Sequence, residues 1–209
     1  MSIILDHIAE NERKWDKLAG SWEKGRYSVF RFFQRKAAER LAGKPGMTFL
    51  DIGCGTGWAV RHISRLAEGK GEFWGVDISG RMIEEARLCS SGNGNLNFLK
   101  ADASELPFRD DYFDNILCTN SFHHYPDPER VIREMERVLK PAGRICILDL
   151  TPDDILTRAL NRIFMKAEKA HVSFYPTPAY REMFSGSRLL HVCSKTVIYP
   201  MKLHIAVKR

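Results

Sequence analysis

Short apolar runs alternate with amphipathic stretches through the middle of the chain, and this alternation limits the folds it can adopt. Brief apolar runs are typical of buried strands, whereas apolar residues three and four positions apart are typical of helices. The runs lie at residues 47–52, 72–78, 95–100, 115–119 and 144–150, and the helical stretches at 57–67, 79–88 and 128–139. Strands that alternate with helices form a parallel sheet covered by helices, so we predict an α/β fold.

The C-terminal part adds two more β-rich runs, at residues 189–199 and 201–207, with a turn near Pro200. We interpret them as a hairpin added to the sheet. Residues 140–143, Lys-Pro-Ala-Gly, are predicted to stop a helix and turn the chain into the strand that follows. The predicted architecture is Rossmann-like and doubly wound, with seven strands, mostly parallel with a C-terminal antiparallel hairpin strand, and with helices on both faces.

Two helical segments lie outside this alternation, at residues 27–41 and 155–170. The second carries a row of basic side chains beside its apolar stripe: Arg158, Arg162, Lys166 and Lys169. A basic amphipathic helix is typical of contact with an anionic or membrane surface, although solvated basic faces are more common.

The charge is unevenly distributed along the 209 residues, whose formal net charge is +6. Residues 1–45 carry +4, residues 46–150 carry −4 and residues 151–209 carry +6. With 44% hydrophobic residues, the chain has the composition of one folded domain, which argues against a disordered protein. The basic flanks indicate an anionic partner or simply a solvated exterior.

The five cysteines are widely separated, with no Cys-x-x-Cys pair and no histidine at zinc-finger spacing. This scatter favours a reducing compartment, and we predict no metal site. The apolar patch near the N-terminus is too short for a signal peptide or a spanning helix, so we expect a cytoplasmic protein.

The run Asp-Ile-Gly-Cys-Gly-Thr-Gly at residues 51–57 places an acid and three alternate glycines between a strand and a helix. Glycines let backbone amides approach a ligand, and the helix N-terminus favours a negatively charged ligand group. Asp77 ends the next strand, where an acid accepts hydrogen bonds from ribose hydroxyls. A nicotinamide or flavin cofactor is one reading, but the spacing differs from G-x-G-x-x-G, so a ligand without a pyrophosphate fits better.

These motifs together resemble the class I S-adenosylmethionine-dependent methyltransferases. The resemblance covers residues 47–150 and rests on DIGCGTG, GVDIS, KADASELPF, FDNILCTNSFHHYPDP and REMERVLKPAGRICILDL, in that order. Within the class, the chain is similar to the small-molecule branch that includes the quinone-biosynthesis C-methyltransferases. The resemblance implies S-adenosyl-L-methionine as cofactor and one methyltransferase domain: a helical cap (1–45), a cofactor-binding core (46–150), a helical insertion (151–188) and a terminal hairpin (189–209).

The resemblance also assigns roles to residues in these motifs. Asp51 would orient the loop and the methionine amine, and Asp77 would hold the ribose hydroxyls. Ile78 and Met82 would contact the adenine. The remaining cofactor-binding residues implied are Gly53, Gly55, Gly57, Asp102, Ala103 and Asn120.

Methyl transfer from a sulfonium is an in-line displacement, and a general base is needed only when the acceptor must lose a proton. Of the adjacent histidines, we predict His123 as the base and leave His124 out. The segment after the fourth strand reads Thr-Asn-Ser-Phe, which lacks the Asn/Asp-Pro-Pro-aromatic pattern of enzymes that methylate base amino groups.

The acceptor is expected to be a small molecule, anionic or lipophilic in character, bound by the segments outside the core. The predicted acceptor contacts are Trp22, Tyr27, Phe122 and Tyr175. Two alternatives remain open: an RNA or protein methyltransferase that uses the basic flanks, although no nucleic-acid module is evident, and a non-catalytic S-adenosylmethionine-binding protein. The sequence does not predict an oligomeric state.

Overall fold

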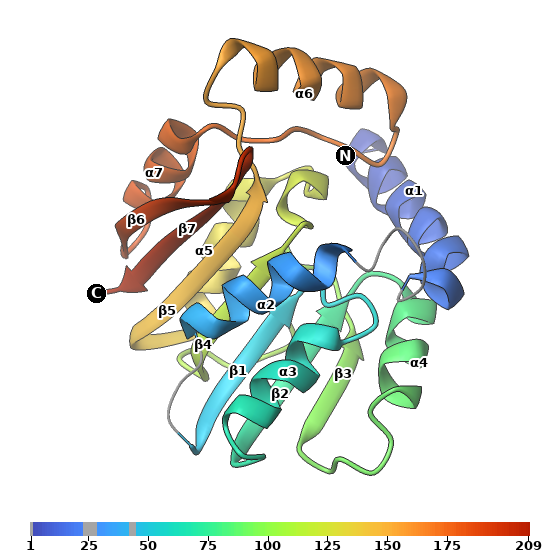
Figure 1. The fold of residues 1–209 in the computed structure, drawn as a ribbon, viewed down its shortest axis with the longest axis vertical. Coiled ribbons are helices and arrows are strands. Elements are labelled where there is room, and N and C mark those ends of the chain that lie inside the picture. The colour runs from blue at the N-terminus through green and yellow to red at the C-terminus, as the bar shows by residue number, and fades with distance from the viewer. Residues whose placement is uncertain (1, 23–28, 42–44) are drawn as a thin grey trace.

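Seven strands form one sheet in the order β3-β2-β1-β4-β5-β7-β6 (Figure 1). This is a computed structural model, and it describes residues 2–22, 29–41 and 45–209. The first five strands pair in parallel: β1 (Met47–Ile52), β2 (Gly71–Asp77), β3 (Leu96–Lys100), β4 (Phe113–Thr119) and β5 (Leu139–Leu150). The last two, β6 (Leu189–Ile198) and β7 (Met201–Lys208), are antiparallel, and β7 lies between β5 and β6. The predicted fold class is confirmed.

Helices cover both faces of the sheet (Figure 1). One face carries α2 (Val29–Leu41), α3 (Trp58–Leu66) and α4 (Gly80–Leu88), and the other carries α5 (Pro128–Val138) and α7 (Thr177–Ser185). Successive strand residues point to opposite faces of the sheet. Phe49 therefore packs on the face that carries α2, α3 and α4, and Leu50 packs on the face that carries α5 and α7; both are fully buried. Burial on both faces explains why the central strands read as continuous apolar runs.

The boundary between α5 and β5 differs from the prediction. The strand pairs from Leu139 onward instead of from residue 144, because Leu139 lies opposite Phe113 and Arg144 lies opposite Asn115. The residues in between bulge out of the ladder, and Ala142 has a φ of 62°. The predicted turn therefore occurs as a bulge within the strand.

Within residues 1–45, predicted as a helical cap with one helix specified at 27–41, the structure has a further helix, α1 (Ser2–Leu18), followed by the short turn η1 (Ala19–Ser21). Asn11 Nδ2 donates to the carbonyl oxygen of His124 over 3.2 Å, and Ser79 Oγ donates to Asp16 over 2.6 Å. These bonds hold α1 at the carboxyl ends of the parallel strands (Figure 1). Because α1 docks partly through polar side chains, its sequence shows little of the apolar periodicity that predicts a helix.

Helix α6 (Ile155–Ala167) lies at the outer end of the molecule (Figure 1). It begins at a capping box, in which Asp154 accepts from the Thr157 amide. Thr157 is buried, but three large apolar side chains of the same helix face outward: Ile155, Leu156 and Ile163 are 85%, 72% and 62% exposed. Among the residues described, no helix is both long and apolar enough to cross a membrane.

Candidate cofactor and acceptor site

A cavity opens at the carboxyl ends of β1, β2 and β4, next to α1, and together with its solvent-filled mouth it encloses about 860 Å³. Because β1 pairs with β2 on one side and β4 on the other, this is where the strand order reverses, the usual ligand position in such sheets. The lining residues are Ile8, Asn11, Trp15, Trp22, Phe30, Gln34, Ile52, Gly53, Gly55, Val76, Asp77, Ile78, Met82, Ala101, Asp102, Ala103, Thr119, Asn120, Ser121, His124, Tyr125 and Pro126.

The glycine loop after β1 forms one wall of this cavity. Gly53 has a φ of 71°, and a Cβ there would come within 2.6 Å of the Ser121 Cβ. Gly55 has a φ of 53°, and a Cβ there would lie 3.2 Å from the Trp22 indole nitrogen. Both positions therefore need glycine, for the left-handed backbone and for the close packing.

Asp77 holds the loop and the next helix through both carboxylate oxygens. Oδ2 accepts from the Gly55 amide at 2.9 Å, and Oδ1 accepts from the Ser79 amide at 3.0 Å. Burial raises its pKa, while these two amides oppose the shift. Asp77 also lines the cavity, so its remaining lone pairs are available to a ligand. Asp77 can therefore hold the loop and the start of α4 and also face a ligand in the cavity.

Asp51 lies beneath the loop rather than on the cavity surface. Its side chain is buried, and neither carboxylate oxygen has a hydrogen-bond partner among the described residues. Burial raises the pKa of Asp51 well above its ordinary value, and the negative charge of Asp77 adds to the shift. A buried, unpaired carboxylate is costly, so this position is prepared for a cationic partner.

The segment after β4 forms the opposite wall. Asn120 has a φ of 52°, and the buried Nδ2 of its side chain lacks a hydrogen-bond partner within the described part of the chain. Such strain and such an unpaired donor at a cavity are typical of functional sites. Next to it, Ser121 Oγ and the Tyr125 hydroxyl are 2.6 Å apart, and both residues line the cavity.

Three aromatic rings close the cavity on the N-terminal side. Trp22 stacks on Phe30 with ring centroids 5.6 Å apart, and Trp15 meets Trp22 edge-on at 5.2 Å. Trp15 also packs edge-on against His124 at 5.1 Å. These rings make the wall apolar, and their faces can attract a cation.

The two adjacent histidines in the turn η3 (Phe122–His124) take different positions. His124 lines the cavity, whereas His123 faces away from it and its Nδ1 lies 2.7 Å from an oxygen of Asp149. Burial lowers the pKa of His123 to about 3 and raises that of Asp149 to about 7.

The structure brings most of the predicted site residues to this one cavity. The predicted residues that line it are Trp22, Gly53, Gly55, Asp77, Ile78, Met82, Asp102, Ala103 and Asn120. Those that do not line it are Asp51, Gly57, Phe122, His123 and Tyr175. Tyr27 lies outside the described residues.

The residues that do not line the cavity have other contacts. The left-handed Gly57 precedes α3 and packs against Phe98, so it fixes the loop rather than touching the cavity. Phe122 is fully buried, and Tyr175 packs on it with ring centroids 5.7 Å apart. Asn11, Ser121, His124 and Tyr125 also line the cavity and were not predicted to do so. Of these four, only His124 stands out in the sequence, because it is adjacent to His123.

Comparisons with known proteins place this geometry in a family. Residues 50–147 match the methyltransferase domain family. The ubiquinone/menaquinone biosynthesis C-methyltransferase UbiE of Vibrio vulnificus is 36% identical over 126 residues, which cover 59% of this chain and 48% of that protein. Residues 50–147 carry a class I methyltransferase domain. It spans about half the length of the curated relatives that it matches.

Solved structures show the same fold. A SAM-dependent methyltransferase from Aquifex aeolicus superposes with a TM-score of 0.72 at 20% identity, over 95% of this chain and 98% of that one. The YcgJ protein from Bacillus subtilis gives a TM-score of 0.72 at 22% identity, over 85% of this chain and 99% of that one. The methyltransferase domain thus shares its architecture with proteins of low sequence identity.

S-adenosylmethionine is the cofactor of this class, and the cavity fits it on three observations. Among the described residues Asp51 has no cationic partner and the Asn120 amide has no acceptor, and the left-handed glycine loop leaves no room for a Cβ at Gly53. The cofactor carries an ammonium, a carboxylate and a ribose, whose polar atoms match these groups. The methyltransferase domain therefore has unpaired buried groups of the kinds that this cofactor would satisfy.

Proposed function

We propose that the protein transfers the methyl group of S-adenosylmethionine to a small-molecule acceptor bound in the same cavity. The observation that carries the proposal is the combination of the buried Asp51 carboxylate beneath the glycine loop and the buried Asn120 amide on the cavity wall, neither of which has a hydrogen-bond partner among the described residues. S-adenosylmethionine supplies a methyl group activated by a sulfonium.

In this proposal the residues of the chain bind and orient. The Asp51 carboxylate attracts the methionine ammonium, and Asp77 accepts from the ribose hydroxyls with the lone pairs that Gly55 and Ser79 leave free. The adenine lies against Ile78 and Met82, with Asp102 and Ala103 at its edge. Asn120 and the backbone of Gly53 and Gly55 hold the methionine portion. Gly57 supports the loop from behind.

The acceptor is proposed to lie between Trp15, Trp22, Phe30 and His124, the part of the cavity wall richest in rings. An apolar wall of this kind favours a lipophilic ring compound and excludes water from the displacement. The name of the UbiE relative describes C-methylation in ubiquinone and menaquinone biosynthesis, and a quinone-type or phenolic acceptor agrees with this wall.

A proton released by such an acceptor would be taken up on the η3 side. His124 contacts the acceptor in this proposal, and its ring centroid lies 3.9 Å from that of His123. His123 remains the proposed base, oriented by the hydrogen bond to Asp149, and the proton would reach it through His124 because His123 does not line the cavity. Phe122 and Tyr175 support this turn from the core and do not touch the acceptor.

The remaining parts of the proposal concern organisation and location. We propose that residues 1–45 and 151–188 cover the acceptor and that the chain works as one domain in the cytoplasm. In support of a reducing location, all five cysteines are free thiols. We further propose that α6 touches an anionic membrane surface, since exposed apolar residues lie beside its basic row.

A methyl-transfer assay with isotopically labelled S-adenosylmethionine tests the proposal. Quinones, phenols and other small molecules are offered in parallel with RNA and with a protein extract, and calorimetry compares S-adenosylmethionine with NAD. Label in a small molecule supports the proposal. Label found only in RNA or protein would show that the acceptor is a macromolecule and not a small molecule. Tighter binding of NAD than of S-adenosylmethionine would refute the cofactor assignment. Cofactor binding with no product from any acceptor would support a non-catalytic binding protein.

A further inference from the structure

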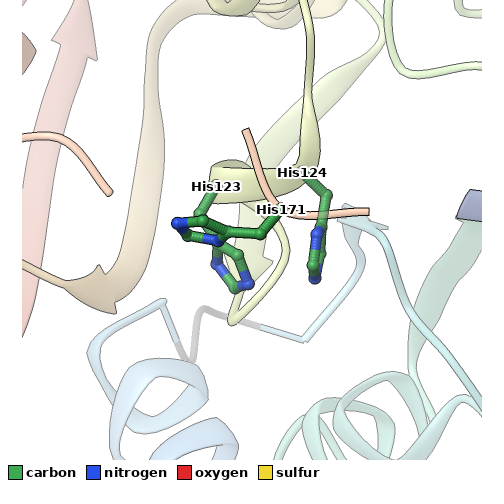
Figure 2. Close-up of side chains that lie close together, drawn as sticks. All are labelled: His123, His124 and His171. Atoms are coloured by element: carbon green, nitrogen blue, oxygen red, sulfur yellow. The ribbon is translucent and has the colours of Figure 1, made fainter. Parts of the chain in front are cut away.

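Three histidine side chains form a cluster beside the cavity (Figure 2). His123 and His124 come from η3, and His171 comes from the segment after α6. One ring nitrogen from each lies within 4.8 Å of one from each of the others. The ring centroids of His123 and His171 are 5.2 Å apart.

Each ring has one nitrogen already held by an oxygen. Nδ1 of His123 lies 2.7 Å from Asp149 Oδ2, and Nδ1 of His124 lies 2.6 Å from the carbonyl oxygen of Ala170. Nε2 of His171 lies 3.1 Å from Asn161 Oδ1. The Asn161 atom is an oxygen because it also accepts from the Phe174 amide at 3.0 Å.

These oxygens fix the proton positions of the neutral rings. A carbonyl, a carboxylate and an amide oxygen all accept, so each ring carries its proton on the nitrogen that faces the oxygen. The other nitrogen of each ring is then a bare lone pair, and the described residues provide no hydrogen-bond partner for any of the three. Oxygen acceptors that orient imidazoles in this way are typical of metal-binding histidines.

We propose that His123, His124 and His171 bind a divalent transition-metal ion of the zinc type at the wall of the cavity. Three imidazole nitrogens suit zinc, copper, cobalt or nickel better than calcium or magnesium. Tetrahedral coordination with nitrogens about 2.0–2.1 Å from the ion requires the rings to close by roughly 1 Å. His124 is the one of the three that lines the cavity, so the ion would lie directly behind that wall.

Charged and aromatic side chains surround the three histidines. Asp149 stands behind His123, buried, with its carboxyl 2.7 Å from Nδ1 of that ring. Lys14 of α1 is ion-paired with Glu168, which neutralises the cation nearest to the cluster. The rings of Phe164 and Phe174 pack on His171, with centroids 5.9 and 4.4 Å away, and limit its movement.

The sequence analysis predicts no metal site because the histidines lack a recognisable spacing. His171 lies 47 positions beyond His124 and reaches it only through the folding of the insertion. The inference does not depend on the proposed function, since ion binding is measured without cofactor or acceptor. An ion held by the free nitrogen of His123 would exclude that residue as the base.

The test uses the full chain, freed of metal by chelation, with the two exposed cysteines Cys89 and Cys193 changed to serine so that thiols do not compete. Titration with Co²⁺ is followed by visible absorption, and Zn²⁺ then displaces the cobalt. We expect one ion per chain and the intense visible bands of tetrahedral cobalt. Octahedral bands, or no saturation below millimolar ion, would overturn the proposal.

Single substitutions distinguish the proposed metal ligands from other residues of the chain. His171→Ala should weaken Zn²⁺ binding at least about 100-fold, whereas the control His62→Ala, whose ring stacks on Trp58, should leave it unchanged. Asn161→Ala should weaken it about 10–100-fold by releasing the His171 ring, with Asn161→Asp restoring binding. Equal affinity in wild type and His171→Ala refutes the site. Circular dichroism and cofactor binding confirm that each variant is folded.

Discussion

At the scale of single residues, Asp77 carries the sharpest prediction about the cofactor. Asp77→Asn keeps the shape and one acceptor oxygen but removes the charge, and we expect S-adenosylmethionine to bind about 10–100-fold more weakly, since a hydrogen bond to a charged group contributes about 1.5–3 kcal/mol. Calorimetric titration measures the affinity. Glu105→Gln, at a carboxylate 85% exposed, is the matched control. An unchanged dissociation constant for Asp77→Asn would refute the ribose role.

Because of Asp51, cofactor affinity and the stability of the cofactor-free protein should change with pH in opposite directions. Because burial raises its pKa well above the ordinary value, the carboxyl stays protonated at pH values where an exposed aspartate is ionised, and it then cannot attract an ammonium. Cofactor affinity should therefore rise with pH through that pKa, by up to about tenfold per unit. The stability of the cofactor-free protein should fall over the same range, because its folded state binds the proton more tightly than the unfolded chain does.

Binding and unfolding measured across that range check the prediction. Asp51→Asn removes the titrating group, so both slopes should flatten and the affinity at neutral pH should fall. Slopes that persist in Asp51→Asn would assign the effect to another group, and Asp77, the nearest acid, is the one to examine.

At the scale of elements, α6 has an outer face that packing does not use. Leu156 and Ile163 are 72% and 62% exposed, and Arg158, Arg162 and Lys166 lie on the same helix. We expect cosedimentation with vesicles rich in anionic lipid, weakened at high salt and absent with neutral lipid. Ile163→Asp should reduce binding several-fold without loss of stability, and Glu105→Gln should not. Wild-type binding to neither vesicle type would indicate a merely solvated or protein-covered face.

The elements also show how far the sequence reaches. The strands of the core were predicted to within a few residues, because burial on both faces makes each one a continuous apolar run. The stretch predicted to be helical at residues 79–88 begins at Ser79, which caps α4 by accepting from the Met82 amide at 3.1 Å. Helix α1 lies in the predicted helical cap, but its bounds were not predicted, since it is held at the cavity by hydrogen bonds that join Asn11 and Asp16 to residues far along the chain.

At the scale of the whole molecule, the cofactor should stabilise the fold. A ligand that binds only the folded state at 100 times its dissociation constant adds about 2.7 kcal/mol, which for a domain of this size raises the Tm by roughly 5–11 °C. Thermal unfolding with S-adenosylmethionine measures this shift, with NAD at the same concentration as the control. Equal shifts from both compounds, or none from either, would contradict the cofactor assignment.

The sequence by itself determined the sheet, the glycine loop and the acids at the strand ends, because these depend on periodicity and on short spacings that survive without any tertiary information. Only the tertiary structure decided which residues meet. It placed His124 rather than His123 at the cavity and brought His171 beside them. It also turned the apolar residues of α6 outward. The reason is that local pattern encodes which face of an element is apolar, whereas long-range packing decides what that face meets.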